Sequence, residues 1–174
     1  MVVLGRFVGL FIDFPKPLIA VVNGHAAGMP VTLLGLCDVV YASEKATFQT
    51  PFNLLGLTPE GCSTMTFPAI MGPAKATEVL LFSKALTARE ACTLGLVTEV
   101  FPDGTFQSQV WKKLKSYGQH PKVSLALSKQ LIRGAIKENL HTANSREYEC
   151  ITGRMYSGEF LNALQNYFQK RSKL

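Results

Sequence analysis

The stretch PLIAVVNGHAAGMP, residues 17–30, sets the pattern for the first half of the chain. Residues 18–24 form a short β-branched apolar run that ends in Asn-Gly, which predicts a buried strand followed by a turn. Gly24 and Gly28 lie in the turn, and residues 29–37 predict a helix with proline in its first turn, where no intrahelical hydrogen bond is lost. The stretch therefore predicts a strand, a glycine turn and a helix in immediate succession.

The turn of this unit is suited to an anionic oxygen. Amide groups in the first turn of a helix lack carbonyl partners and carry partial positive charge. A glycine such as Gly28 also lets a ligand approach the backbone closely. Many strand-turn-helix connections share these features, so the residues alone fit both a structural role and an anion-binding role.

Similar short elements are predicted on both sides of this unit. Pro102 marks a change, because only helical periodicity is present from about residue 104 onward. We expect about three helices there, with Pro121 opening one and the Gly153–Gly158 region interrupting another. The other predicted elements are a helix over 2–14, strands over 38–42, 46–50 and 96–101, a helix over 73–82, and a capping box at 87–90 that opens a helix ending near Gly95. Strand-turn-helix units followed by an all-helical region predict one layered α/β domain.

The stretch NLLGLTPEGCSTMTFP, residues 53–68, contains one carboxylate, Glu60, and no basic residue. A glutamate on a solvated surface usually has charged neighbours. Burial among residues such as Leu57, Cys62 and Phe67 would raise the pKa of Glu60 by desolvation. Glu60 is therefore either a first-turn glutamate favoured by a helix dipole or an acid–base group with a raised pKa.

Charge is unevenly distributed along the chain, whose formal net charge is +6. Residues 1–105 carry six Lys and Arg against eight Asp and Glu, whereas residues 106–174 carry twelve against four. The basic excess fits an ordinary solvated helix surface, a phosphorylated ligand or an acidic partner. The sequence has no zinc-finger spacing, aromatic RNA-binding signature or long Arg run, so we expect no nucleic-acid partner.

Other features of the composition bear on membranes, metals and partners. The most apolar stretch, residues 18–37, is interrupted by Asn23, His25 and Pro30, so we predict no membrane span. The four cysteines have no CxxC spacing and the three histidines are scattered, so we predict free thiols and no metal site. Hydrophobic residues make up 47% of the chain, which suggests apolar surface covered by a partner.

Joined to its neighbours, the opening stretch resembles a known family. The motifs are KPLIAVVNG (16–24), CD (37–38), ATFQTP (46–51), GPAKA (72–76) and LTAREACTLGLV (86–97). In this order they resemble the enoyl-CoA hydratase/isomerase (crotonase) superfamily over at least residues 7–105. Within it, PEGCSTMTFP (59–68), the opening over 7–24 and the SKL ending are most similar to the peroxisomal delta3-delta2-enoyl-CoA isomerases. The chromodomain Y-like proteins are similar through the same region.

The resemblance implies an α/β fold, a crotonase-like spiral of ββα units followed by a C-terminal helical trimerisation region. Residues 1–103 would form the C-terminal part of the spiral, lacking its first turns, and residues 104–174 the helical region. A complete domain of this family begins well before Met1, so the loop that donates the first oxyanion amide is expected to be missing. We therefore expect this chain alone to be a weak isomerase or inactive, and a homotrimer is the implied assembly.

The resemblance also assigns a site. Two backbone amides of the family bind the thioester oxygen of an acyl-CoA, and the second of them matches Met29. Hydratases of the family use two glutamates, whose positions are here Thr32 and Phe52, whereas the peroxisomal-type isomerases use one glutamate, which matches Glu60. The implied substrate-binding positions are Ala27, Gly28, Phe52, Leu55, Gly56 and Gly61. No metal and no separate cofactor are implied, because coenzyme A is part of the substrate.

These parts imply isomerisation of a 3-enoyl-CoA to the 2-trans-enoyl-CoA in the β-oxidation of unsaturated fatty acids. One base with a raised pKa can remove the proton beside the carbonyl and return it at the far end of the shifted double bond, without water. The alternative is a non-catalytic acyl-CoA-binding or assembly subunit of the same fold, because the region of the first oxyanion donor is expected to be absent.

The last three residues, Ser172, Lys173 and Leu174, match the peroxisomal import address that a receptor reads at a free C-terminus. They predict an import receptor as a partner and localisation in the peroxisome matrix. A chromatin-associated relative is a third reading. It is disfavoured by this ending and by the absence of a chromodomain from the sequence.

Overall fold

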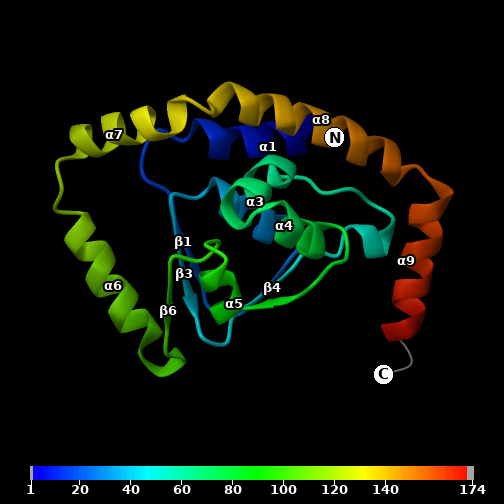
Figure 1. The fold of residues 1–174 in the computed structure, drawn as a ribbon, viewed down its shortest axis with the longest axis horizontal. Coiled ribbons are helices and arrows are strands. Elements are labelled where there is room, and N and C mark those ends of the chain that lie inside the picture. The colour runs from blue at the N-terminus through cyan, green and yellow to red at the C-terminus, as the bar shows by residue number, and fades with distance from the viewer. Residues whose placement is uncertain (1, 172–174) are drawn as a thin grey trace.

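The computed structural model describes residues 2–171, in which short strands and helices alternate before a run of longer helices (Figure 1). The strands are β1 Ile19–Val22, β2 His25–Ala27, β3 Val39–Ser43, β4 Thr47–Gln49, β5 Leu86–Thr87 and β6 Glu99–Phe101. The α-helices are α1 Val2–Asp13, α2 Met29–Thr32, α3 Ser63–Met71, α4 Pro73–Leu80, α5 Ala88–Thr93, α6 Phe106–Tyr117, α7 Lys122–Gly134, α8 Lys137–Met155 and α9 Gly158–Arg171. Short 3-10 turns are η1 Leu33–Leu36, η2 Asn53–Leu55 and η3 Asp103–Thr105.

The six strands form two small sheets, and the first four strands alternate between them. The first is parallel, in the order β1-β3-β6, with Ile19 opposite Val39 and Tyr41 opposite Glu99. In the second, β2 and β4 are parallel and β5 adds to β4 in the antiparallel sense. The pairs β1-β2 and β3-β4 each place one strand in each sheet before the chain enters a helix. This repeat and the helical C-terminal part confirm the predicted α/β architecture.

The main core lies between the sheets and the helices α3, α4 and α5. Phe48 from β4 and Phe67 from α3 are both fully buried in it. Burying a side chain of this size stabilises a fold by roughly 1.5–3 kcal/mol. A second cluster joins α1 to α8 through Val8 and Leu140, and it includes Cys62. The segment between β4 and α3 is therefore anchored at both ends, by Phe48 in the main core and by Cys62 in the second cluster.

The helices α6 to α9 form an arc around the outside of the sheets (Figure 1). As predicted, α7 starts directly after Pro121 and α9 starts at Gly158. The prediction of three helices is wrong within residues 104–171, because the chain also breaks between α7 and α8. Gly134, a poor helix former, ends α7. Ile136 then packs against the α1–α8 cluster, so α8 can follow α1.

Asp38, which directly precedes β3, fastens α7 to the first sheet. Its carboxylate pairs with Lys129 at 2.8 Å and with Arg133 at 3.2 Å, and it accepts a hydrogen bond from the Leu18 amide at 2.7 Å. Lys129 is 8% exposed, and its ammonium also donates to the Lys16 carbonyl at 2.7 Å. Each charge in this partly buried group thus has more than one partner, as ions shielded from water require.

Several local elements differ from the sequence prediction. The predicted helix over 29–37 is a short α2 followed by the 3-10 turn η1, and the predicted turn at 25–27 is β2, which pairs with β4. Helix α3 is not predicted, because Pro68 in its interior disfavours a helix. The capping box is confirmed, since the Thr87 hydroxyl accepts from the Glu90 amide at 3.2 Å and the Glu90 carboxylate accepts from the Thr87 amide at 2.8 Å.

Other predictions concern thiols, membranes and the ends of the chain. The cysteines are free thiols, as predicted. None of the helices within residues 2–171 combines the length and the apolar character needed to cross a bilayer. The division of the chain after residue 103 stays a prediction, and the tripeptide Ser172, Lys173 and Leu174 lies outside the described residues.

Candidate active site

Glu60 lies in the loop between η2 and α3 and is 4% exposed. Its Oε1 lies 3.5 Å from the hydroxyl oxygen of Thr32, while Oε2 has no hydrogen-bond partner among the described residues. The carbonyl oxygen of Glu60 accepts from the Ser63 hydroxyl at 2.8 Å, which ties the residue to the first turn of α3. Glu60 itself precedes Cys62, the N-cap residue of α3, so it is not a first-turn glutamate.

This environment favours the neutral form of the Glu60 carboxyl. Burial raises its pKa from 4.5 to about 7, the negative charge of Glu147 acts in the same direction, and the contact with Thr32 opposes them. A carboxyl group with a pKa near neutrality can take up and release a proton at physiological pH. Burial and charge thus give Glu60 the properties of an acid–base group.

Thr32 connects Glu60 to the glycine turn. Its hydroxyl donates to the Met29 carbonyl at 3.0 Å, and the same oxygen lies 3.5 Å from Glu60 Oε1. Met29 is the first residue of α2 and follows Gly28, whose amide donates to the Gln49 carbonyl at 2.8 Å. An amide in the first turn has no carbonyl one turn earlier to bond. The fold therefore brings Glu60 and the start of α2 together across one threonine side chain.

The Thr32 hydroxyl has two acceptors within reach, the Met29 carbonyl at 3.0 Å and Glu60 Oε1 at 3.5 Å. A hydroxyl has one hydrogen to donate, and the shorter contact is the one to Met29. The hydrogen bond to Glu60 is therefore long. It acts to lower the pKa of Glu60, but burial and the charge of Glu147 outweigh it.

Gly61 permits the close approach of the Glu60 loop to α2. A Cβ atom at this position would lie 2.5 Å from the Thr32 hydroxyl oxygen. Gly61 has φ +70° and Cys62 has φ 62°, so two consecutive residues adopt the left-handed conformation. That conformation costs about 1–2 kcal/mol in a residue with a side chain. Gly61 is thus required by both its own φ and the proximity of Thr32.

Three other predicted substrate-binding residues flank this centre. Ala27 ends β2, is exposed and directly precedes Gly28. Phe52 precedes η2 and is 7% exposed, and its carbonyl accepts from the amides of Leu55 at 3.0 Å and Leu57 at 2.9 Å. Leu55 is half-buried. The substrate-binding roles of Ala27, Phe52 and Leu55 stay predictions.

Gly56 lies against the C-terminal helices. Its φ is +67°, and a Cβ atom there would lie 3.2 Å from the Phe160 amide nitrogen of α9. Its carbonyl accepts from Arg154 Nε at 3.0 Å. Packing between the loop and α9 therefore accounts for the glycine, and a role in substrate binding stays a prediction.

Glu147 lies beside the site, and the sequence analysis does not identify it. It is 5% exposed on α8, and it accepts hydrogen bonds from the amides of Cys62 at 2.6 Å and Thr64 at 2.9 Å and from the Thr64 hydroxyl. Burial raises its pKa, while these hydrogen bonds act to lower it. The helical spacing could have predicted its burial, because Glu147 lies on the same face of α8 as the apolar residues Leu140 and Ile151.

Both glutamates adjoin one small cavity. It has a volume of about 10 Å³, close to that of a single water probe, and it lies between α1 and α8. A larger hollow of about 590 Å³ lies between α5 and β6, near Arg89 and Cys92, and contains none of the predicted site residues. Within residues 2–171, no group of three or more His, Cys, Asp or Glu side chains is arranged to hold a metal ion.

Comparison with known proteins gives a consistent family. The family model described as enoyl-CoA hydratase/isomerase matches residues 8–173. The chain is 59% identical over 173 residues to enoyl-CoA delta isomerase 2 of Homo sapiens, covering 99% of this chain and 44% of that protein. It is 52% identical over 171 residues to the peroxisomal enoyl-CoA delta isomerase 3 of Mus musculus, covering 98% and 54% respectively. The similarity to chromodomain Y-like proteins is confirmed at 46% identity over 166 residues for the Homo sapiens protein, covering 95% and 28%.

Solved structures agree on the fold. The crystal structure of an enoyl-CoA hydratase/isomerase from Pseudoalteromonas atlantica T6c matches with a TM-score of 0.91 and 36% identity, covering 95% of this chain and 66% of that one. From the coverages of 44% and 54% given above, the chain spans about half the length of the curated isomerases that it matches. Because the family model covers nearly every residue and the ββα spiral coincides with that of a solved crotonase-like protein, the chain belongs to the enoyl-CoA hydratase/isomerase family.

Proposed function

We propose that this chain carries the acid–base centre of an enoyl-CoA delta isomerase, with Glu60 as the single base. The substrate would be a 3-enoyl-CoA and the product the 2-trans-enoyl-CoA, as in the β-oxidation of unsaturated fatty acids. The observation that carries the proposal is a dry carboxyl with one unpaired oxygen, held beside the start of α2 through Thr32. The names of the relatives at 59% and 52% identity support the same reaction class.

The proton moves between two carbons of the acyl chain. The ionised Glu60 takes the proton from C2, between the thioester carbonyl and the double bond, and the electrons of the C2–H bond form a dienolate. The neutral Glu60 then gives the proton to C4, a C2=C3 bond forms and the thioester carbonyl is restored. A base with a pKa of about 7 suits both halves of this transfer.

The negative charge that develops on the thioester oxygen needs a donor. We assign this role to the backbone amide of Met29, because it opens α2 directly after Gly28 and lies next to the residue that contacts Glu60. A pre-positioned donor of this kind is commonly worth about 3 kcal/mol of barrier. The methionine side chain is not involved, so a backbone amide at this position is all that the reaction requires.

Hydration is not proposed, because it needs a second acid–base group to activate water. Thr32 and Phe52, at the positions of the two hydratase glutamates, carry no titratable group. Thr32 is fully buried against Glu60, and Phe52 is 7% exposed. Isomerisation needs only one acid–base group, and Glu60 can provide it.

The test is conversion of a 3-enoyl-CoA by the purified chain, followed by the absorbance of the conjugated thioester. We expect slow turnover that Glu60→Gln abolishes. Glu149→Gln is the matched control, because Glu149 is an exposed glutamate and the change removes the same charge. An unchanged rate in Glu60→Gln would remove Glu60 from the mechanism. Binding of the acyl-CoA with no turnover in any variant would favour the non-catalytic acyl-CoA-binding subunit.

A homotrimer is proposed as the assembly. Its support is an apolar side of α7, where Val123, Leu127 and Leu131 are 73%, 55% and 83% exposed. Their spacing places them on one helical face. Light scattering of the purified chain should give the mass of three copies, and a monomer at micromolar concentration would contradict the proposal.

Import into the peroxisome matrix is proposed from Ser172, Lys173 and Leu174. Similarity to a relative named as peroxisomal supports it. A fluorescent protein fused to the N-terminus should enter peroxisomes, and removal of the tripeptide should disperse it. Unchanged import after the removal would contradict the proposal.

A further inference from the structure

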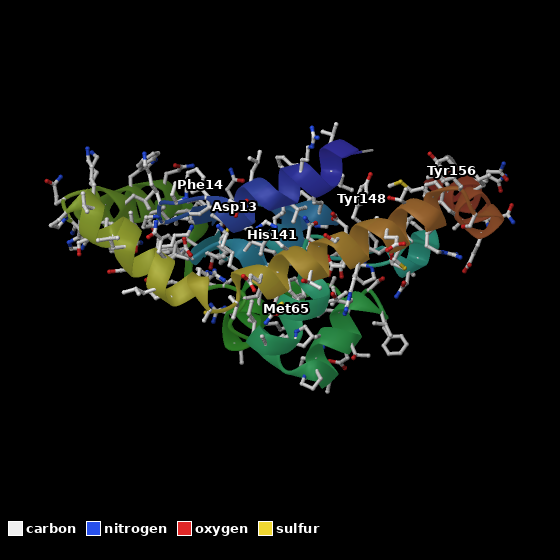
Figure 2. All side chains as sticks on the ribbon, turned by 90° about the horizontal axis from the view of Figure 1, so that it is seen from above. Asp13, Phe14, Met65, His141, Tyr148 and Tyr156 are labelled. Carbon is white, nitrogen blue, oxygen red and sulfur yellow. The ribbon has the colours of Figure 1, made fainter. Side chains whose placement is uncertain are left out.

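Helix α8 lies between the two elements that enclose Glu60. It packs along α1 and also contacts α3. Figure 2 shows Tyr148 on α8 close to α1, and Met65 of α3 on the other side of α8. At its start, α8 is tied to the end of α1, because Asp13 pairs with Lys137 at 2.7 Å and with His141 at 3.1 Å. The position of α8 is therefore fixed independently of Glu60.

Glu147 extends from this helix to the first turn of α3. The N-cap residue of α3, Cys62, provides no side-chain hydrogen bond to its own helix. Glu147 takes that place, since Oε2 accepts from the Cys62 amide at 2.6 Å and Oε1 from the Thr64 amide at 2.9 Å. A carboxylate is the favoured partner for the unpaired amides at a helix start. The α3 cap is thus supplied by a residue 85 positions away in the sequence.

The capped turn is continuous with Glu60. The Glu60 carbonyl accepts from the Ser63 hydroxyl in the same turn at 2.8 Å. Between them, Gly61 and Cys62 are both left-handed, and Cys62 is held there although it has a side chain. The bond from the Cys62 amide to Glu147 stabilises this conformation. Within residues 2–171, Glu147 is the acceptor of the Cys62 amide, so the turn that carries Glu60 depends on it for this restraint.

We propose that Glu147 is a positioning residue for Glu60, holding the first turn of α3 from α8 so that the Glu60 carboxyl stays buried against Thr32. The proposal deepens the function proposed above and rests on it for its catalytic meaning. Glu147 does not need to touch the substrate. It acts through the backbone of the turn and through its charge.

The charge of Glu147 is the second way in which it acts on Glu60. Both residues adjoin the same cavity of about 10 Å³, and the negative charge of Glu147 raises the pKa of Glu60. The charge of Glu60 also acts on the Cys62 thiol, and Tyr148 is the other titratable residue that lines this cavity, whereas α1 contributes only Leu4, Gly5 and Val8. Glu147 is therefore the one carboxylate besides Glu60 at this cavity.

The test is the titration of the Glu60 carboxyl by ¹³C NMR in chains labelled at glutamate, with the signal assigned from Glu60→Gln. In the wild type we expect a midpoint near 7. In Glu147→Gln, which keeps the size of the side chain and removes its charge, the midpoint should fall but stay above 4.5, because burial still raises the pKa of Glu60. If the chain turns over, the rising limb of its rate against pH should shift to lower pH in the same variant.

Glu149→Gln is the matched control, because it removes an exposed glutamate from the same helix. Its Glu60 midpoint should equal that of the wild type. A folded Glu147→Gln with an unchanged Glu60 midpoint and an unchanged pH profile would overturn the proposal. A role in stability alone would lower the unfolding midpoint without moving either readout.

A further measurement needs no variant at position 147. In the wild type, the Glu147 carboxyl signal should respond when Glu60 titrates, since two interacting acids titrate as a pair. A Glu147 signal that does not change through the Glu60 midpoint would overturn the proposal even if Glu147→Gln does not fold. Failure of the isomerase proposal is separate, because it is read from turnover in Glu60→Gln, whereas this coupling is measured without substrate.

Discussion

Two buried carboxyl groups meet beside the start of α3, and their surroundings differ. Glu147 accepts three hydrogen bonds from Cys62 and Thr64 and so has the partners of a carboxylate. Glu60 has one contact of 3.5 Å, to Thr32, and an unpaired Oε2. Hydrogen bonds to the charged form favour ionisation, and burial without them favours protonation. Burial raises the pKa of both acids, but hydrogen bonds oppose this rise at Glu147 far more than at Glu60.

At the residue scale, the raised pKa of Glu60 predicts that the fold loses stability as the pH rises. The folded-state pKa of about 7 lies above the ordinary value of 4.5, so the contribution is full below pH 4.5 and is lost as the pH rises through 7. This difference corresponds to about 3 kcal/mol. Glu60→Gln cannot ionise. We expect its free energy of unfolding in urea to match the wild type near pH 4 and to exceed it by up to about 3 kcal/mol at pH 8.

Glu149→Gln controls for the loss of one negative charge and should show no such pH dependence. An equal difference between Glu60→Gln and the wild type at both pH values would mean that Glu60 is not dry in the folded chain.

Secondary-structure elements could be predicted from the sequence where interactions between neighbouring residues determine them. The Thr87 and Glu90 pair and the proline before α7 act on neighbouring residues, and both predictions are confirmed. Strand β2 depends on pairing with β4, and α3 forms around Pro68 with Phe67 and Met71 buried in the core, so neither element could be predicted from neighbouring residues alone. At the site, the isolation of Glu60 in its stretch left a first-turn glutamate and a buried acid–base group as alternatives, and the burial of Glu60 before the N-cap of α3 agrees with the second. Glu147 was not predicted to lie at the site, because its contact with the Cys62 amide joins residues 85 positions apart.

At the scale of elements, the join of the Glu60 loop to α2 predicts a specific sensitivity at Gly61. Gly61→Ala adds a Cβ atom 2.5 Å from the Thr32 hydroxyl oxygen at a φ of +70°. We expect a loss of roughly 1–3 kcal/mol in the free energy of unfolding, from left-handed strain and overpacking. Denaturation in urea measures it.

Gly134→Ala is the matched control at the end of α7. A Cβ atom there meets nothing within 4 Å. Alanine should stabilise the helix by about 0.5–1 kcal/mol. If both alanine variants change stability by the same amount and in the same direction, the loop and α2 are not in contact as described.

At the scale of the whole molecule, the arc of helices is fastened to the spiral at separate points. The Tyr117 hydroxyl of α6 lies 2.8 Å from that of Tyr41 in β3. Helix α7 is held by Asp38, and α8 is held through Glu147 at the start of α3. Because α8 both adjoins Glu60 and belongs to this arc, the helical C-terminal part contributes to the candidate site.

Asp38 is the point where one substitution should loosen the arc most. Asp38→Ala leaves Lys129, which is 8% exposed, and Arg133 without their carboxylate. Breaking a buried pair in this way costs about 3–5 kcal/mol, measured as the free energy of unfolding. Glu78→Ala removes an exposed carboxylate paired with Lys75 and should cost far less, because an exposed ion pair contributes little to stability. Equal costs for the two variants would show that Asp38 does not secure α7.

The central claim is that one dry carboxyl, Glu60, carries the same proton from C2 to C4 of the bound acyl chain. The most direct measurement uses a 3-enoyl-CoA with deuterium at C2, converted by the chain in ordinary water and analysed by mass spectrometry and NMR. Because Glu60 is 4% exposed, a substantial share of the deuterium should appear at C4 of the 2-trans product. Product with no deuterium at C4 would contradict the claim.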